Sequence, residues 1–328
     1  MSDFSVKIKA IEYSLGEICE FNSDLKKDNP DWNIEQIEQK TGVSQRWIAK
    51  KTTTALDLAF LASEKLFNYV NRKEVDTLIL VTQSPDYFLP TSACILQEKL
   101  SLSTNTKCFD ISMGCSGFVY GLSIASSFIE SGLGNNVLLL CADTYSKFIE
   151  KNDRTNRPIF SDAASATLIV KDNKENIGPF LMGTDGSGHE HLIVANGAAR
   201  SGFDSKDSKP RIHMNGSSVF MFTMSQVPSN INTLLSSCSL TIEDIDMFIF
   251  HQASKIVLDR LKEKLKIKDS NFFCNSEKIG NTVSSSIPIA LKEADELSKI
   301  SDGDQILISG FGVGLSWGSC ILNWSKLS

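Results

Sequence analysis

The chain has 328 residues, a mass of 36.1 kDa, 41% hydrophobic and 22% charged residues, and a net charge of −6. This composition excludes a disordered protein, and the negative charge argues against a general nucleic-acid binder. No apolar run reaches the roughly 18 residues that cross a bilayer, and the first residues lack the apolar segment of a secretory signal. The eight cysteines form no Cys-x-x-Cys pair. We therefore expect a reduced, cytoplasmic protein without membrane or nucleic-acid partners.

Short strand-like runs alternate with helical patterns along the chain, which predicts an α/β fold. In the first half, strands are expected at 77–82, 107–113 and 137–142, and an amphipathic helix at 117–131. In the second half, we expect strands at 246–250 and 305–309, a helix at 254–266 and an extended run at 271–276. The stretch 171–215, rich in Gly, Asp, Ser and Lys, is interpreted as the connection between the halves.

The order of elements in the second half repeats that of the first half. Asn281 follows Cys115 by 166 residues, and Gly310 follows Ala142 by 168 residues. A near-constant offset indicates two similar units. We predict two pseudo-symmetric α/β halves with stacked helix and sheet layers. Their predicted bounds are residues 1–175 and 176–328.

Cys115 lies in the segment Asp-Ile-Ser-Met-Gly-Cys-Ser-Gly-Phe, at the passage from a strand to a helix. Gly114 and Gly117 allow a sharp turn and leave space beside the sulfur. The free N–H groups at a helix start favour the thiolate, which is the nucleophilic form of cysteine. A structural cysteine buried at a glycine-rich turn is the alternative, and this motif alone does not separate the two interpretations.

Two further polar residues stand at similar places. His251 follows a wholly apolar strand, and Asn281 lies in a Gly-Asn turn before a helix. Taken alone, each is more typical of a structural role, a core histidine and a turn asparagine. The repeat, however, places both at the same sheet edge as Cys115, where α/β proteins place their sites. Their joint occurrence predicts a catalytic site.

Four motifs resemble those of β-ketoacyl-ACP synthase III, an initiating condensing enzyme of fatty-acid biosynthesis. They are Gly-Cys-Ser-Gly-Phe, His-Gln-Ala-Ser, Gly-Asn-Thr-Val-Ser-Ser-Ser-Ile-Pro and Phe-Gly-Val-Gly-Leu-Ser-Trp-Gly-Ser, and they stand in the family's order. The resemblance extends over essentially the whole chain. It implies a thiolase-like fold and an acyltransferase that acts as a homodimer. No metal and no bound organic cofactor are implied, since the CoA thioester and acyl carrier protein are substrates.

The resemblance also implies roles for individual residues. Cys115 would take the acyl group from acyl-CoA. His251 and Asn281 would bind the thioester carbonyl of malonyl-ACP, or of malonyl-CoA, while CO2 leaves. The resulting enolate would attack the acyl-Cys115 thioester and give a β-ketoacyl-ACP. Backbone N–H groups of Cys115 and of the loop after Phe311 would hold the oxyanion. The candidate loop residues are Gly312, Val313 and Gly314.

Several positions depart from the family pattern. The family commonly has three glycines where this chain has Gly312-Val313-Gly314, and valine cannot easily adopt a positive φ. Leu89, beside Phe88, stands where the family has the phenylalanine that lines the acyl pocket across the dimer. The family's His-Gln-Ala-Asn is His-Gln-Ala-Ser here. These differences predict a divergent, non-housekeeping member with a different acyl substrate.

The segment 255–268 carries a local charge of +4 in an acidic chain. Carrier proteins and CoA are acidic, so we expect Lys255, Lys262 and Lys264 to steer them toward the site. An ordinary solvated helix face is the alternative. Arg154 resembles a CoA contact of the family.

Three other functions compete with decarboxylative condensation. The first is an acyltransferase that passes the acyl group of Cys115 to an amine, an alcohol or a β-keto acid without decarboxylation. The second is a cysteine hydrolase, since Cys, His and Asn follow in papain's order, but the Cys-Gly-Ser-Cys-Trp context is missing. The third is a non-catalytic binding module. Retention of His251 and Asn281 favours condensation.

Overall fold

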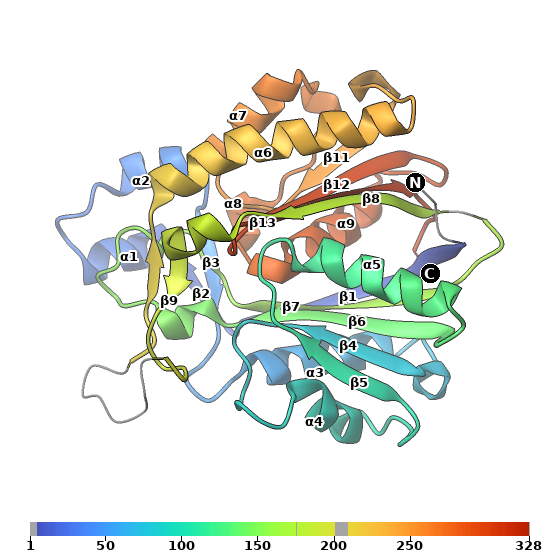
Figure 1. Ribbon diagram of the computed structural model, residues 1–328. Coiled ribbons are helices and arrows are strands. Elements are labelled where there is room, and N and C mark those ends of the chain that lie inside the picture. The colour runs from blue at the N-terminus through green and yellow to red at the C-terminus, as the bar shows by residue number, and fades with distance from the viewer. Residues whose placement is uncertain (1–4, 175, 201–208, 328) are drawn as a thin grey trace.

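The computed structural model describes residues 5–174, 176–200 and 209–327. Two main sheets form its framework (Figure 1). The first has the order β1-β7-β6-β4-β5, with β1 (Val6–Leu15), β4 (Thr77–Val81), β5 (Lys107–Ile111), β6 (Asn136–Asp143) and β7 (Ala163–Lys171). The second has the order β11-β12-β13-β8, with β8 (Ile177–Thr184), β11 (Met247–Phe250), β12 (Gln305–Gly312) and β13 (Ser316–Asn323).

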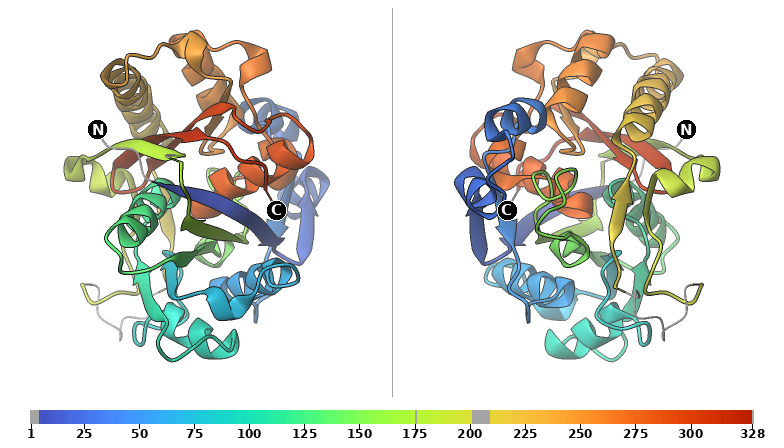
Figure 2. Two further views of the ribbon diagram at one scale, coloured as in Figure 1. Left: turned by 90° about the vertical axis from the view of Figure 1, so that its right-hand side faces the viewer. Right: turned by 90° about the vertical axis from the view of Figure 1, so that its left-hand side faces the viewer.

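Helices cover both faces of each sheet, so the molecule is built in layers (Figures 1 and 2). On the outer face of the first sheet lie α3 (Ala55–Leu66) and α4 (Ser92–Lys99). Between the two sheets lie α5 (Gly117–Glu130) and α9 (Ser286–Glu296). On the outer face of the second sheet lie α6 (Gly216–Ser237) and α7 (Lys255–Leu265). The predicted stacking of helix and sheet layers is therefore present.

Smaller elements surround this framework. At the N-terminal side they are β2 (Ile18–Phe21), α1 (Asn22–Asp28), α2 (Ile34–Thr41), β3 (Gln45–Ile48) and the 3₁₀ turn η1 (Arg72–Glu74). The middle of the chain adds η2 (Tyr145–Phe148), η3 (Gly186–His191), β9 (Leu192–Val194) and β10 (Ile212–Met214). The last are η4 (Ile242–Asp244), η5 (Asp269–Asn271), α8 (Ser276–Ile279) and η6 (Val283–Ser285). Among the residues described, no helix has the length and apolarity needed to cross a membrane.

The two sheets repeat one pattern of strand directions. In the first, β4 is parallel to β5 and β6, while β6, β7 and β1 pair in antiparallel fashion. In the second, β11 is parallel to β12, while β12, β13 and β8 pair in antiparallel fashion. Where the first sheet has β5, the second has a single parallel bridge between Phe248 and Phe272. The predicted pseudo-symmetry is thus visible in the strand order.

Two expectations about the second half need correction. The run 271–276 is not a strand: beyond the bridge, only the N–H of Phe273 bonds to Phe248, and α8 starts at Ser276. The stretch 171–215 is more than a connection, because it contains β8, an edge strand of the second sheet. β8 contains two glycines and a proline, which are uncommon within strands, so its sequence does not indicate a strand. The boundary at 175/176 falls between β7 and β8 and stays a prediction.

The strands whose carboxyl ends carry the site loops are held in place by burial. Every residue of β4 is buried, as expected for a central parallel strand that helices cover on both faces. Phe118, Leu122 and Ile129 of α5 pack between the sheets in one continuous core. The strands β4, β5, β6 and β11 therefore hold the loops at their carboxyl ends in fixed positions.

Candidate active site

Cys115 lies in the turn that joins β5 to α5, and only 5% of its surface is exposed. The turn is tight: the N–H of Gly117 donates to the carbonyl of Gly114 over 2.7 Å. A Cβ at position 114 would lie 2.4 Å from Oε1 of Gln83 and 2.6 Å from Cγ1 of Val313. These contacts require a glycine before the cysteine.

The loop after Phe311 passes directly beside the sulfur. A Cβ at Gly312 would lie 2.9 Å from Sγ of Cys115, and this glycine has a φ of 156°. Gly314 has a φ of 140°, whereas Val313 is not among the residues with positive φ. Val313 is therefore compatible with this loop, because the two flanking glycines, and not the valine, adopt the positive φ angles. The backbone N–H of Val313 bonds to the thiol of Cys115.

Burial dominates the electrostatics of the thiol and raises the pKa of Cys115 to about 12. The backbone N–H groups of Val313 and Cys115 oppose this rise, and the carboxyl of Asp143 adds to it. This direction is opposite to the expectation that the helix start favours the thiolate of Cys115. α5 begins two residues after Cys115, and desolvation outweighs the remaining N–H groups.

His251 directly follows β11 and is 2% exposed. Its backbone N–H donates to the carbonyl of Ser309 over 2.8 Å, and its Nδ1 lies 2.7 Å from Oγ of Ser286. The ring meets that of Phe311 edge-on at 5.7 Å. Burial lowers the pKa of His251 to about 3, so the imidazole is neutral.

Asn281 lies between α8 and η6, where Gly280 has a φ of 72°. Its backbone bonds to Ile159 and Ser161 and fixes the turn to the first half of the chain. Its Oδ1 accepts the N–H of Val283 over 2.9 Å, and its Nδ2 lies 3.3 Å from Nε2 of His251.

The structure brings the three predicted residues together. Cys115, His251 and Asn281 line one cavity of about 250 Å³, together with Phe311 and Gly312. The cavity can admit a slender chain, since its other lining residues are mostly apolar. The sulfur therefore faces a narrow chamber that also holds a neutral imidazole and an amide.

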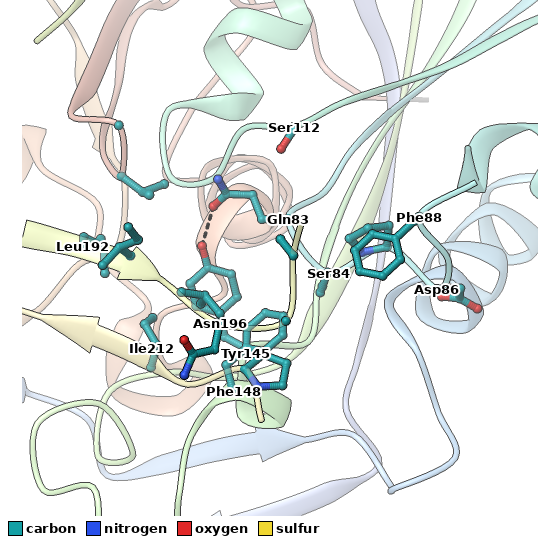
Figure 3. A pocket seen from close by; sticks show the side chains of 18 of the residues that line it. Gln83, Ser84, Asp86, Phe88, Ser112, Tyr145, Phe148, Leu192, Asn196 and Ile212 are labelled. Carbon is teal, nitrogen blue, oxygen red and sulfur yellow. Dashed lines mark hydrogen bonds between the residues drawn. The ribbon is translucent and has the colours of Figure 1, made fainter. Parts of the chain in front are cut away.

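A second and larger cavity has a volume of about 980 Å³ (Figure 3). Val313 and Gly314 line it, and Leu192 lines both cavities. Phe88 and Leu89 stand at this cavity with 73% and 82% of their surface exposed. The two residues that the sequence assigned to an acyl pocket thus lie at the larger cavity.

The charged candidates are less well placed. Arg154 is exposed and lines neither cavity, although its neighbour Thr155 lines the smaller one. The three lysines of α7 already have partners within the chain. Lys255 pairs with Asp259 and Lys262 with Asp269, each at 2.6 Å, and Lys264 donates to the carbonyl of Met224 over 2.8 Å.

Sequence reasoning missed three residues close to Cys115. The Tyr145 hydroxyl donates to Oε1 of Gln83 over 2.5 Å. Asp143 accepts from the N–H of Gln83 over 2.8 Å and from Oγ of Ser284 over 2.5 Å, and burial raises the pKa of Asp143 to about 7. Asp143 ends β6, and Gln83 and Tyr145 follow β4 and β6; β4 lies beside β5, the strand that precedes the nucleophile, and β6 is the next strand along the sheet. Their positions at the ends of strands could have indicated that they belong to the site.

No group of three or more His, Cys, Asp or Glu side chains within 5–174, 176–200 and 209–327 could hold a metal ion.

A cysteine that shares one cavity with a histidine and an asparagine, at the meeting of two similar layered halves, defines a thiolase-like condensing enzyme. Comparison with known proteins agrees. The family model for 3-oxoacyl-[acyl-carrier-protein] synthase III matches residues 109–186, and the model for its C-terminal part matches residues 235–324. The chain belongs to the β-ketoacyl-[acyl-carrier-protein] synthase III family.

Individual relatives support this assignment over nearly the full length. The β-ketoacyl-[acyl-carrier-protein] synthase III of Caldanaerobacter subterraneus subsp. tengcongensis is 38% identical over 312 residues, 93% of either chain. A crystal structure of a 3-oxoacyl-(acyl-carrier-protein) synthase III superposes with a TM-score of 0.95 at 41% identity, covering 98% of this chain and 100% of that one. The priming β-ketosynthase of the R1128 polyketide pathway has a TM-score of 0.93 at 26% identity, covering 100% and 98%. The predicted family, thiolase-like fold and acyltransferase class are confirmed.

Proposed function

We propose that the chain loads an acyl group from acyl-CoA onto Cys115 and condenses it with malonyl-ACP, releasing CO2 and a β-ketoacyl-ACP. The observation that carries this proposal is the shared cavity of Cys115, His251 and Asn281. A nucleophile and two neutral hydrogen-bonding groups in one enclosed space suit a two-step reaction on thioesters.

In the first step, the Cys115 sulfur attacks the thioester carbonyl of acyl-CoA. The new bond joins Sγ to the acyl carbon, the bond to the CoA sulfur breaks, and the thiol proton ends on CoA. Negative charge develops on the carbonyl oxygen during the attack. The backbone N–H groups of Val313 and Cys115, which already face the sulfur, would hold that charge.

In the second step, the thioester carbonyl of malonyl-ACP would accept hydrogen bonds from His251 Nε2 and Asn281 Nδ2, which lie 3.3 Å apart. The bond to the carboxylate breaks, CO2 leaves, and the electron pair forms an enolate. The enolate carbon attacks the acyl carbon on Cys115, and the sulfur leaves and regains a proton. A neutral His251 fits this role because it can donate without attracting the carboxylate as a cation would.

Transfer to an amine, an alcohol or a β-keto acid without decarboxylation is not favoured. The cited relatives that are more than 30% identical and cover most of the chain are β-ketoacyl-[acyl-carrier-protein] synthases.

Intact-protein mass spectrometry and CO2 release test the two steps separately. Wild type and Cys115→Ala are incubated with a panel of acyl-CoAs, and then with malonyl-ACP. We expect an acyl mass gain on the wild type alone, followed by its loss with release of one CO2 per acyl group. An acyl adduct that malonyl-ACP does not remove would contradict the proposed condensation step. Acyl labelling of Cys115→Ala would contradict the assignment of Cys115 as the nucleophile.

We further propose that the acidic carrier docks near the C-terminal end of α7. Lys255, Lys262 and Lys264 are tied to partners in the chain. Lys266 and Lys268 are exposed beyond the helix and carry no ion pair among the described residues. Charge reversal at Lys266 and Lys268 should raise the KM for malonyl-ACP at low salt, with little change for a malonyl-CoA substrate. An unchanged KM for the carrier would refute this surface.

A homodimer is also proposed. Tyr87, Phe88 and Leu89 form a consecutive apolar patch, exposed by 61%, 73% and 82%. Apolar side chains this exposed are typical of an interaction surface, and the patch stands at the mouth of the larger cavity. Light scattering should give twice the chain mass, and Leu89→Asp should shift the measured mass toward that of the monomer.

The cytoplasmic location and the lack of a cofactor stay predictions.

A further inference from the structure

Two polar side chains meet inside the larger cavity. Gln83 and Tyr145 approach from the ends of neighbouring strands, and the Tyr145 hydroxyl donates to Oε1 of Gln83 over 2.5 Å (Figure 3). Burial raises the pKa of Tyr145 well above its ordinary value, so the phenol keeps its proton and stays a donor. In this arrangement the amide oxygen of Gln83 faces Tyr145 and Nε2 points away from it.

The pair lies beside the nucleophile. A Cβ at Gly114, the residue before Cys115, would lie 2.4 Å from Oε1 of Gln83 and 3.2 Å from the Tyr145 hydroxyl. An acyl chain on Cys115 that enters the larger cavity therefore passes Gln83 within its first few atoms.

One hydrogen-bonding atom of Gln83 has no partner among the described residues. Its backbone N–H donates to Asp143 and its Oε1 accepts from Tyr145, but Nε2 bonds to no group in the described part of the chain. The surrounding walls are largely apolar, with Phe148, Leu192 and Val313 among them. Nε2 of the half-buried Gln83 therefore has no protein partner in the described part of the chain, in a cavity whose lining is mostly apolar but also includes Ser84 and Ser112.

We propose, on the basis of the proposed function, that the acyl group loaded on Cys115 carries an oxygen near its thioester end, which accepts a hydrogen bond from Nε2 of Gln83. A purely hydrocarbon chain would displace the water from this donor and leave it unpaired. An acyl chain with a hydroxyl, carbonyl or ether oxygen there would satisfy it. The cost of burying an unpaired donor corresponds to a preference of about tenfold or more.

A pair of acyl-CoAs of matched shape tests this preference. 3-Hydroxybutyryl-CoA and isovaleryl-CoA differ only in a hydroxyl in place of a methyl group. The rate of acyl-adduct formation on Cys115 is measured for both by intact-protein mass spectrometry. We expect the wild type to load the hydroxyacyl group about tenfold faster. In Gln83→Met, which keeps the length but has no N–H, the ratio of the two rates should fall to about one.

Gln83→Glu provides a second variant that keeps the acceptor for Tyr145 and removes the donor. It should also lose the preference, and circular dichroism establishes that each variant is folded. Equal loading rates in the wild type, or a preference that survives both substitutions, overturn this inference and leave the proposed function standing. Absence of an adduct with every acyl-CoA overturns the proposed function, and this inference with it.

Discussion

The side-chain nitrogen of Asn281 lies 3.3 Å from Nε2 of His251, and both atoms face the cavity of Cys115. The amide cannot turn freely, because its oxygen accepts the N–H of Val283 over 2.9 Å. The imidazole is held at its other nitrogen by Ser286. Because Nδ2 can only donate, Nε2 accepts from it in this contact. The oxygen of a thioester carbonyl can sit between two donors in the tautomer that carries the imidazole proton on Nε2.

Asn281→Ala should separate the two steps of the reaction. Loading of Cys115 needs no contact with the amide, so the acyl adduct should form at a rate close to that of the wild type. CO2 release from malonyl-ACP should fall about 10²–10³-fold, the usual loss for one preorganised donor. Mass spectrometry follows the first step and CO2 release the second. An equal loss in both steps would show that Asn281 holds the fold of the site rather than the carbonyl.

Ser286 is expected to position His251. Its hydroxyl has one proton, which can go to Nδ1 of His251 at 2.7 Å or to the carbonyl of Val283 at 3.0 Å. When it goes to Nδ1, the imidazole proton resides on Nε2, which then donates toward the cavity. Ser286→Ala should lower condensation about tenfold or more, since the tautomer is no longer selected.

Ser286→Thr is the matched control, because it keeps the hydroxyl. The ratio of condensation to loading is the informative quantity, since a merely structural role would lower both together. If Ser286→Ala and Ser286→Thr behave alike in this ratio, the hydroxyl does not select the tautomer.

Gly312→Ala should abolish loading. The added methyl group would lie 2.8 Å from Cβ and 2.9 Å from Sγ of Cys115, closer than real contacts allow. The loop would have to move, and the N–H of Val313 would move away from the sulfur with it. Gly186→Ala is the control, since a Cβ there meets nothing within 4 Å. Normal loading by Gly312→Ala in the mass assay would contradict the geometry of the loop.

Much of the framework could be predicted from local patterns. β4, β6 and β11 are continuous apolar runs that local patterns predict. His251 directly follows β11, and Cys115 lies four residues after β5, so both residues could be placed at strand ends. β8 was not predicted, because the Gly-Pro pair near its start is typical of a loop. Short apolar runs and turn glycines are local signals, whereas the pairing of an edge strand depends on distant partners.

The chemistry of the site was less accessible from sequence. Gln83 and Tyr145 are 62 residues apart and belong to no motif, so their contact follows only from the parallel pairing of β4 and β6. The protonation of Cys115 was predicted in the wrong direction. A helix start is a local feature of the sequence, but desolvation results from the packing of the whole site, including Phe160 and Val283.

The buried thiol of Cys115 makes a prediction about pH. With a pKa of about 12, the thiolate fraction should rise tenfold with each unit of pH from 7 to 10, because the group stays far below its midpoint. The rate of alkylation by iodoacetamide should follow this rise without a plateau. The Cys115 peptide is quantified by mass spectrometry after timed exposure, since Cys94 and Cys274 are exposed and also react. The peptide that contains Cys94 monitors the reagent in the same sample. A rate for Cys115 that levels off near pH 7 or 8 would instead indicate a thiolate stabilised by the N–H groups of the turn, which would then outweigh burial.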